Sequence, residues 1–265
     1  MEKIPSELIE KLSDTGLSAW RYFPVVTSTN DLALDWAGAG AADYSLIIAD
    51  TQTAGRGRGD RQWVTQPGAA LAFSLILRPT PNEAALVPRF TALAALSLLD
   101  ALAPLGLEGK IKWPNDVLLS GKKVAGVLVE ADWHEDQLTA LVVGMGVNVT
   151  PAAVPPDASL RYPATSLETA AGRKLDRWAV LASILHSLLN YRDLLTTPEF
   201  IRLWNERLAF RGEPVKFRFP DSKVESLKVV GVQSNGQLLL ETPQGEPLSG
   251  VAGEIELAGR DKESE

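Results

Sequence analysis

The segment with the most potential for chemistry is a loop of glycines and arginines at residues 52–63, QTAGRGRGDRQW. The three glycines let the backbone approach a ligand closely and adopt positive φ angles. The three arginines add permanently charged, planar donors, each of which can clasp a phosphate with two parallel hydrogen bonds. This composition favours an anion-binding loop that becomes ordered on binding over the alternative, a solvated structural loop.

Two common nucleotide-binding patterns do not describe this loop. Its third glycine is misplaced for the Rossmann fingerprint, and no helical pattern follows it. The chain contains no Gly-x-x-x-x-Gly-Lys-Ser/Thr stretch, which excludes a P-loop NTPase. The loop therefore needs a different explanation.

A second candidate segment is residues 112–116, Lys-Trp-Pro-Asn-Asp. Pro114 restricts Trp113 to an extended conformation, so we expect a strand to stop there and the chain to turn. Asn115 and Asp116 would then lie at a strand end, where their oxygens can reach a ligand or Mg²⁺. A plain Pro-Asn-Asp turn explains the same residues.

A third candidate segment is residues 123–126, Lys-Val-Ala-Gly. It places Lys123 at the start of an aliphatic strand and Gly126 where a backbone can touch a substrate. A surface lysine is the alternative. The two histidines suggest no nucleophilic triad, because His134 falls in a polar turn and His186 on a predicted helix, and both are interpreted as structural.

Taken together, in this order and spacing, these segments resemble the catalytic domain of the biotin–protein ligases. That family shares Ser-Thr-Asn, here residues 28–30, with Gly-Arg-Gly-Arg-x-x-Arg-x-Trp, Lys-Trp-Pro-Asn-Asp and Lys-x-Ala-Gly. The resemblance continues through residues 144–148, Gly-Met-Gly-Val-Asn, and 164–167, Ala-Thr-Ser-Leu, to Trp204. It covers nearly the whole chain from Trp20, in the form of the family without the N-terminal DNA-binding domain of its regulatory members.

The resemblance implies an ATP-dependent ligase that forms biotinyl-5′-adenylate and transfers biotin to a specific lysine of a carrier protein. AMP and pyrophosphate would be released, with ATP and Mg²⁺ as cofactors. The implied partner is the biotin carboxyl carrier protein of acetyl-CoA carboxylase or a related carboxylase. A lipoate–protein ligase, a biotin-sensing repressor and a catalytically inactive binding module are the alternatives, and the arginine loop with Lys-Trp-Pro-Asn-Asp favours biotin over lipoate.

The resemblance also implies a role for each motif residue. Lys123 would bridge the biotin carboxylate and the α-phosphate, and Arg58 would belong to the closing loop. Independently of the resemblance, the attacking lysine must lose a proton, and Asp116 is the carboxylate that we expect to accept it. These three are the predicted catalytic residues. The predicted biotin-binding residues are Ser28, Thr29, Asn30, Gln52, Gly55, Arg56, Gly57, Arg58, Lys123, Gly126, Gly144 and Gly146. The predicted ATP-binding residues are Arg58, Arg61, Trp63, Lys112, Asn115 and Asn148.

The tryptophans and two departures from the family pattern complete this set of expectations. Trp63 and Trp113 would either cover the ligands or lie in the core. No metal ligand is assigned, although the polar residues at the 112–116 turn would face ATP and Mg²⁺. Gly59-Asp60 stands where Arg-Gly or a similar pair is frequent, and an acidic residue weakens the positive field of a phosphate loop. From Glu254 the chain has no arginine before Arg260, where some members carry a basic residue.

Hydrophobic periodicity predicts the elements that must position these residues. The predicted strands of the main part are 20–26, 45–51, 69–78, 110–113, 123–131 and 138–149, the last two forming a hairpin. The predicted helices are 1–12, 28–37, 89–102, 176–195 and 198–208, with a turn at 114–122 and a surface loop at 151–163. Short strands at 215–219, 224–232, 237–241 and 254–257 predict a small β-barrel.

The predicted fold class is therefore α+β, a mixed β-sheet with flanking helices plus a small C-terminal β-barrel. The resemblance implies that the main part is class II synthetase-like and that the barrel is SH3-like. We place the catalytic biotin- and ATP-binding domain at residues 1–210 and the barrel domain at residues 211–265.

Composition limits the class of protein. The 265 residues are 45% hydrophobic and 22% charged, which is typical of a soluble globular protein with a substantial core. A net charge of −7 provides no basic field for nucleic acid, so we expect no specific DNA binding. The absence of cysteine excludes disulfides and thiolate chemistry. A charged N-terminus and no apparent apolar run of bilayer length predict a cytoplasmic protein, and an edge strand could pair two copies as a homodimer.

Overall fold

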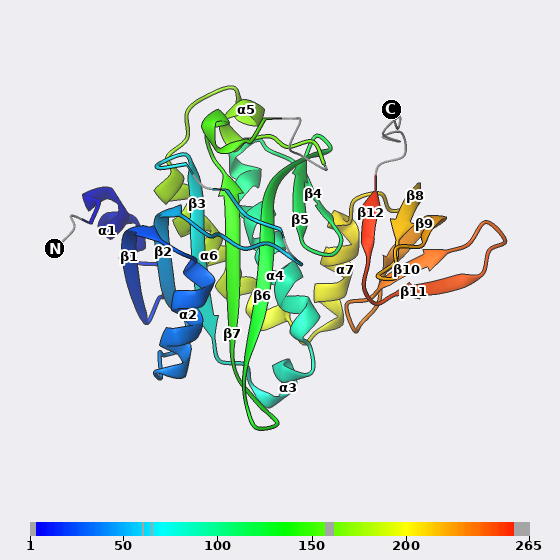
Figure 1. Cartoon of the computed structure of the whole chain (residues 1–265), viewed down its shortest axis with the longest axis horizontal. Coiled ribbons are helices and arrows are strands. Elements are labelled where there is room, and N and C mark those ends of the chain that lie inside the picture. The colour runs from blue at the N-terminus through cyan, green and yellow to red at the C-terminus, as the bar shows by residue number, and fades with distance from the viewer. Residues whose placement is uncertain (1–3, 60, 65, 157–161, 257–265) are drawn as a thin grey trace.

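A seven-stranded sheet carries the larger part of the chain in the computed structural model, which describes residues 4–59, 61–64, 66–156 and 162–256 (Figure 1). Its strand order is β1-β2-β3-β7-β6-β5-β4. Only β1 and β2 run parallel, and every other neighbouring pair is antiparallel, so the predicted mixed sheet is confirmed. The strands are β1 (Ala19–Val26), β2 (Ser45–Gln52), β3 (Ala70–Leu77), β4 (Gly109–Lys112), β5 (Asp116–Leu119), β6 (Lys122–His134) and β7 (Gln137–Asn148).

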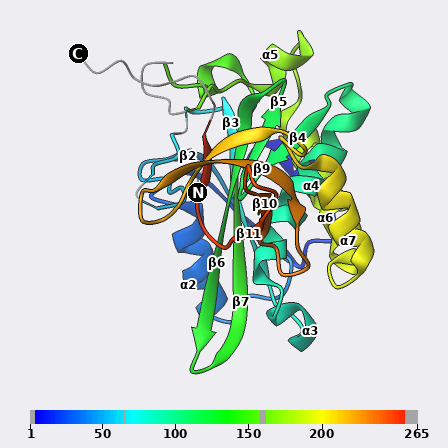
Figure 2. The ribbon, with the colours of Figure 1, turned by 90° about the vertical axis from the view of Figure 1, so that its right-hand side faces the viewer.

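Helices cover both faces of this sheet. Figure 2 shows α2 (Thr29–Gly38) and α4 (Val87–Leu102) on opposite sides of β6 and β7. The α4 side holds the main core, to which α1 (Ser6–Leu12), α6 (Arg177–Leu194) and α7 (Pro198–Arg207) contribute. The α2 side is thinner: Ala33 and Ala37 pack on Ile47, Ile76 and Val142. Every residue of β3 is buried, because the strand is covered from both sides.

Helix α4 is a long, apolar helix. Together with the following 3₁₀ turn η1 (Ala103–Leu105) it forms a 19-residue helical stretch, Val87–Leu105, of mean hydropathy 1.2. The expectation that no apolar run is long enough to span a bilayer is therefore wrong, if only the length and the composition of the helix are considered. Of the most apolar window of this stretch, 67% is buried inside the protein, as in the core helix of a soluble protein.

The structure adds elements that the sequence patterns did not predict. Strand β5 lies where a turn was expected at 114–122, because the chain reverses after Lys112 and pairs back on β4. Strand β6 is also longer than predicted, reaching His134. The other unpredicted elements are α3 (Pro81–Ala84), η2 (Pro151–Ala153), α5 (Leu167–Ala171) and β11 (Pro247–Gly250).

The C-terminal part forms a separate five-stranded antiparallel sheet of order β11-β10-β9-β8-β12. Its other strands are β8 (Pro214–Arg218), β9 (Val224–Val232), β10 (Leu238–Glu241) and β12 (Glu254–Glu256). Within the described part of the chain no ladder joins the two edge strands, β11 and β12, so the sheet is open. The prediction of a closed small barrel is not confirmed, although short strands in this region are.

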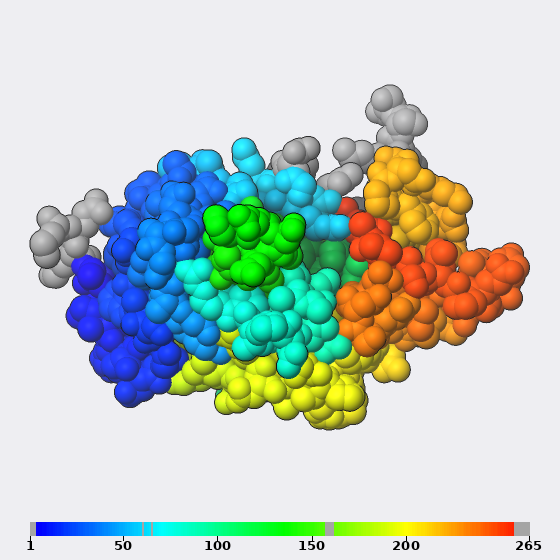
Figure 3. All heavy atoms as spheres, turned by 90° about the horizontal axis from the view of Figure 1, so that it is seen from below, coloured from blue at the N-terminus to red at the C-terminus, as the bar shows by residue number. Residues whose placement is uncertain are grey.

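The small sheet rests directly against the main body (Figure 3). The turn between β9 and β10 makes the contact. Buried Arg89 of α4 donates to Ser234 O at 2.7 and 3.0 Å and to Leu195 O at 2.5 Å. Trp113 Nε1 donates to Gly236 O at 3.1 Å, and its ring lies 6.0 Å from that of Phe217. One buried guanidinium and one indole therefore fix the small sheet to the main body.

Replacing Arg89 with methionine should lower the free energy of unfolding by roughly 1–3 kcal/mol, because the buried carbonyl of Leu195 and the partly buried carbonyl of Ser234 lose a charged donor. Urea denaturation followed by tryptophan fluorescence measures the change. Arg202→Met is the matched control, since Arg202 lies on the exposed face of α7, where it pairs with exposed Glu199 and Glu206. Equal effects of the two substitutions would contradict the assigned role of Arg89.

Candidate active site

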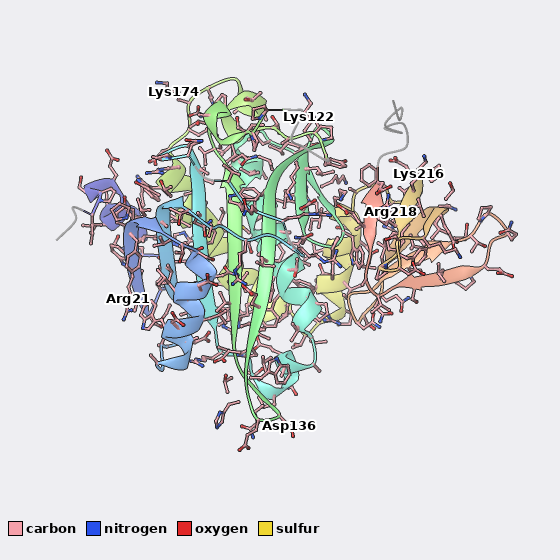
Figure 4. The ribbon with its side chains drawn as sticks, viewed as in Figure 1. Arg21, Lys122, Asp136, Lys174, Lys216 and Arg218 are labelled. Carbon is pink, nitrogen blue, oxygen red and sulfur yellow. The ribbon has the colours of Figure 1, made fainter. Side chains whose placement is uncertain are left out.

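The candidate site is a cavity on the α2 side of the sheet, where the loop after β2 crosses β7 and β6 (Figure 1). Figure 4 marks the two ends of the β6–β7 hairpin beneath it, Lys122 at the start of β6 and Asp136 in the turn. The cavity is lined by Ser28, Thr29, Asn30, Gln52, Arg56, Gly57, Arg58, Arg61, Gln62, Trp63, Asn115, Asp116, Lys123, Gly126, Val127, Leu128, Gly144, Met145 and Gly146.

Strand register brings the separate motifs together. Asp116 of β5 pairs with Gly126 of β6, which pairs with Gly146 of β7. Side chains two residues apart on a strand point to the same face of the sheet. The paired residues Leu128 and Gly144 therefore face the same side as Gly126 and Gly146. The Lys-Trp-Pro-Asn-Asp, Lys-x-Ala-Gly and Gly-x-Gly motifs thus form one continuous floor.

The glycines of this floor leave room for side chains from above. A Cβ at Gly144 would lie 2.0 Å from Asn30 Oδ1, and one at Gly146 would lie 2.2 Å from Trp63 Cε2. Both distances are far shorter than a carbon can tolerate, so any larger residue would displace the helix start or the loop. Glycine is required at both positions by close approach rather than by backbone angles.

A network of small polar groups forms one end of the cavity. Gln52 Oε1 accepts from Thr29 N at 2.8 Å and from Thr29 Oγ1 at 3.1 Å, so it satisfies the first amide of α2. Ser74 Oγ contacts Thr29 Oγ1 at 2.8 Å and Asn30 Oδ1 at 2.6 Å. Ser28, at the N-cap position, is buried and makes no capping bond with its side chain. This end suits a small ligand with donors and acceptors in one plane.

The other end of the cavity is cationic. Lys123 Nζ lies 2.6 Å from Asp116 Oδ1, and Lys112 Nζ lies 3.6 Å from Asp116 Oδ2. Lys112 is 1% exposed, and burial lowers its pKa below the ordinary value of 10.5. Burial likewise raises the pKa of Tyr162, whose ring lies 5.0 Å from Lys112 Nζ, to about 12. One buried carboxylate is therefore held between two ammonium groups.

The arginine loop closes over the cavity as a short hairpin. Gly57 N donates to Arg61 O at 2.7 Å and Trp63 N donates to Gly55 O at 2.8 Å. Trp63 lies on the glycine floor, 5.8 Å from Lys123 Nζ measured at its ring centroid. Two groups in this region, Trp63 Nε1 and Tyr162 Oη, are buried without a hydrogen-bond partner among the described residues. Such groups are uncommon in native proteins and favour a ligand acceptor here.

The three arginines of the loop point to different partners. Arg56 pairs with Glu130 of β6 and with Asp31 of α2. Arg58 donates to Gly253 O at 2.8 Å, and Arg61 lies 2.5 Å from Glu254 of β12. The loop is thus attached both to the main sheet and to the small sheet.

Most predicted site residues lie together in this cavity. Gly55 is the exception among the predicted biotin-binding residues, because it lies behind the lining, where its Cβ would be 2.4 Å from Trp63 O. Lys112 and Asn148 do not line the cavity either; Asn148 Nδ2 donates to Thr165 O at 3.1 Å. Trp113 is buried against the small sheet, as its core interpretation expects. The expectations for Asp60 and Arg260 lie outside the described residues.

Sequence reasoning missed several residues of the site. Glu130 and Glu254 bind loop arginines, yet they lie 74 and 193 residues from their partners, and no spacing rule connects such positions. Leu128 was interpretable only as a strand residue, although alternation with Gly126 could have placed it at the floor; Val127 and Met145 point to the opposite face, where they join the main core, although they also line the cavity. His186 Nε2 contacts Asp14 O at 2.9 Å, and neither histidine lines the cavity.

Comparisons with known proteins agree with this arrangement. The sequence model of the Biotin/lipoate A/B protein ligase family matches residues 22–148. The bifunctional ligase/repressor BirA of Bacillus subtilis is 37% identical over 230 residues, covering 84% of this chain and 70% of that protein. The biotin–[acetyl-CoA-carboxylase] ligase of Paracoccus denitrificans is 35% identical over 228 residues, covering 82% and 92%.

A solved structure shares the fold as well as the sequence. The biotin protein ligase from Aquifex aeolicus, in complex with biotin and ATP, matches with a TM-score of 0.77 at 28% identity, covering 91% of this chain and 98% of that one. The relatives above 30% identity, the shared fold and the convergence of five of the motifs (28–30, 55–63, 112–116, 123–126 and 144–148) on one cavity lead to a single assignment. The chain belongs to the biotin–protein ligase family and is a biotin ligase.

Proposed function

We propose that this enzyme uses ATP to form biotinyl-5′-adenylate and then transfers biotin to a specific lysine of a biotin carboxyl carrier protein. One observation carries the proposal. The polar end and the cationic end belong to one cavity, whose floor is formed by glycines and which is covered by a loop with three arginines. The related biotin protein ligase from Aquifex aeolicus, solved in complex with biotin and ATP, supports the same pair of ligands.

The polar end would hold the ureido ring of biotin, and the cationic end would hold its carboxylate and the nucleotide. A carboxylate oxygen of biotin would attack the α-phosphorus of ATP, and the bond from that phosphorus to the pyrophosphate oxygen would break. The two reactants are both anions, so the site must supply positive charge where they meet. Lys123, with Arg58 and Arg61 of the loop, supplies it and stabilises charge on the phosphorus oxygens.

In the second step a neutral lysine amine of the carrier would attack the acyl carbon, and AMP would leave. Asp116 is the carboxylate closest to Lys123, and we assign it as the acceptor of the amine proton. Lys112, which pairs with Asp116 across β4 and β5, contacts the second oxygen of that carboxylate. The buried ammonium thus orients Asp116 without touching a substrate, and we assign it a positioning role.

The residues at the cationic end fit a magnesium ion held chiefly by nucleotide phosphates. Among the described residues no group of three or more His, Asp or Glu side chains is arranged to hold a metal. Mg²⁺ with nucleotides needs only one or two protein oxygens. Asn115 and Asn148 each donate their amide nitrogen to a carbonyl, so the Oδ1 oxygen of each is the atom that would be offered to the ion. The ion would neutralise phosphate charge, which is its usual contribution.

We further propose that residues 1–210 form the catalytic domain and that residues 211–265 form a second, SH3-like domain that supports the loop. The contacts of Arg58 with Gly253 and of Arg61 with Glu254 support this division of labour. ATP binding would then depend on the small domain indirectly, through the arginines that it holds.

ATP–pyrophosphate exchange tests the proposed function. Exchange should require biotin, lipoate should not replace it, and Lys123→Ala should reduce it by about 100- to 1000-fold, the usual effect of removing one transition-state charge partner. Lys122→Ala is the control, because Lys122 is the exposed neighbour at the end of β6. Exchange that proceeds without biotin, or equally with lipoate, would reject the assignment.

Replacing Arg58 with glycine should increase the rate at which the adenylate leaves the enzyme, by about 10-fold or more, because the loop loses its contact with Gly253 O. Rapid dilution of enzyme loaded with labelled adenylate measures this rate. Arg21→Ala on the edge strand β1 should leave it unchanged. A release rate for Arg58→Gly equal to that of the wild type would rule out retention by this arginine.

The buried ammonium of Lys112 should give the stability of the enzyme a specific pH dependence. Burial lowers the pKa of Lys112 in the folded state. Between that lowered pKa and 10.5, Lys112 is therefore protonated in the unfolded chain and largely neutral in the folded protein. Because the unfolded chain binds more protons over this range, the contribution of Lys112 to the free energy of unfolding increases with pH. Urea denaturation of the wild type and of Lys112→Met at several pH values measures this. The free energy of unfolding of the wild type, relative to that of the variant, should increase toward alkaline pH. A difference that moves the other way would contradict this reasoning.

A further inference from the structure

Arg56, the first arginine of the loop, is held by two carboxylates. Its Nη1 and Nη2 donate to Glu130 Oε1 and Oε2 at 2.8 and 2.6 Å, which is a two-bond fork. The same Nη2 lies 2.6 Å from Asp31 Oδ1. Two negative charges therefore surround one positive charge, and the local balance is acidic rather than basic.

This arrangement separates Arg56 from the other two arginines of the loop. A phosphate approaching Arg56 would have to displace a carboxylate that already occupies the guanidinium fork, next to a second carboxylate that repels it. Among the described residues, Arg61 contacts one carboxylate, that of Glu254, and Arg58 donates to a neutral carbonyl, so neither is held between two carboxylates as Arg56 is. Arg56 is thus suited to anchoring the loop and not to gathering anions.

Glu130 also reaches the polar end of the cavity. Asn30 Nδ2 donates to Glu130 Oε2 at 2.7 Å and to Leu128 O at 3.3 Å. Asn30 Oδ1 accepts from Ser74 at 2.6 Å, so hydrogen bonds to the protein engage both polar atoms of this amide. Asn30 therefore shapes the pocket wall above Gly144 and is engaged by the protein instead of being held ready for a ligand.

We propose that Glu130 is a positioning residue that couples the loop to the biotin end of the pocket, with Arg56 as its partner and Asp31 as a second anchor. Through one carboxylate, the position of the loop and the position of Asn30 become interdependent. This inference rests on the proposed function and adds a defined task, retention of the adenylate, to a residue outside the family motifs. Exposed ion pairs usually contribute little, but bidentate geometry and a shared network are the conditions under which they matter.

A double-mutant cycle tests the coupling. We expect Glu130→Gln and Arg56→Met each to increase the release rate of preformed biotinyl-adenylate by about 10-fold, because each breaks the same charge-assisted fork. The double variant should also be about 10-fold faster, instead of the roughly 100-fold expected for independent effects. Arg56→Lys, which keeps the charge and loses the fork, should give an intermediate rate. Effects of the two single variants that multiply would overturn the proposal.

A control variant checks that the change in release rate is specific to Glu130, and a measurement without ligand tests the anchoring of the loop without any catalysis. Glu135→Gln removes an exposed carboxylate from the tip of the same hairpin and should leave the release rate unchanged. In the unliganded protein, Glu130→Gln should speed hydrogen exchange at the amides of Gly57 and Trp63, which close the loop hairpin. Unchanged exchange would overturn the anchoring role even if the wild type formed no adenylate.

The two measurements also separate this inference from the proposed function. A wild-type enzyme that forms no adenylate would reject the function, and exchange at the loop amides would still decide the anchoring. If the wild type forms and retains the adenylate, and Glu130→Gln releases it no faster, the result would reject only the inference about Glu130.

Discussion

The site depends on one constraint: three positions of the central strands β6 and β7 that face the cavity are glycines. Gly126, Gly144 and Gly146 lie in adjacent rows of the β6–β7 pair, and they open a floor on which Asn30 and Trp63 can lie against the backbone. A helix start and a loop, from distant parts of the chain, can then approach the same strands. The strands themselves bring the polar and the cationic ends of the cavity into line, so a ligand that spans both ends is fixed along its length.

The sequence was sufficient to identify the family and most of the sheet, because both depend on local signals. Motifs of three to nine residues carried the resemblance, and alternation or aliphatic runs predicted the strands that β1, β2, β3, β6 and β7 occupy. The convergence of the motifs on one cavity also followed from the family resemblance. Register explains it physically, since Asp116, Gly126 and Gly146 are neighbours across three strands.

Other features could not be predicted, because they depend on contacts between distant residues. The reversal at Trp113–Pro114 was expected, but whether Asp116–Leu119 would continue as a turn or pair back as β5 depended on the neighbouring strands. The open edge between β11 and β12 replaced an expected barrel for the same reason. No local pattern marks Glu130 or Glu254 as partners of loop arginines, since carboxylates on strands are ordinarily solvated.

Carboxylates, rather than apolar side chains, supply several of the attachments of the loop, to β6 and α2 at one end and to β12 at the other. Such attachments respond to dissolved ions, because charges at a protein surface are screened over about 8 Å at physiological ionic strength. The loop would therefore loosen as salt concentration rises, while the apolar core beneath the sheet would not. The lifetime of a reactive intermediate under this loop is in that sense tied to the ionic composition of the surrounding solution.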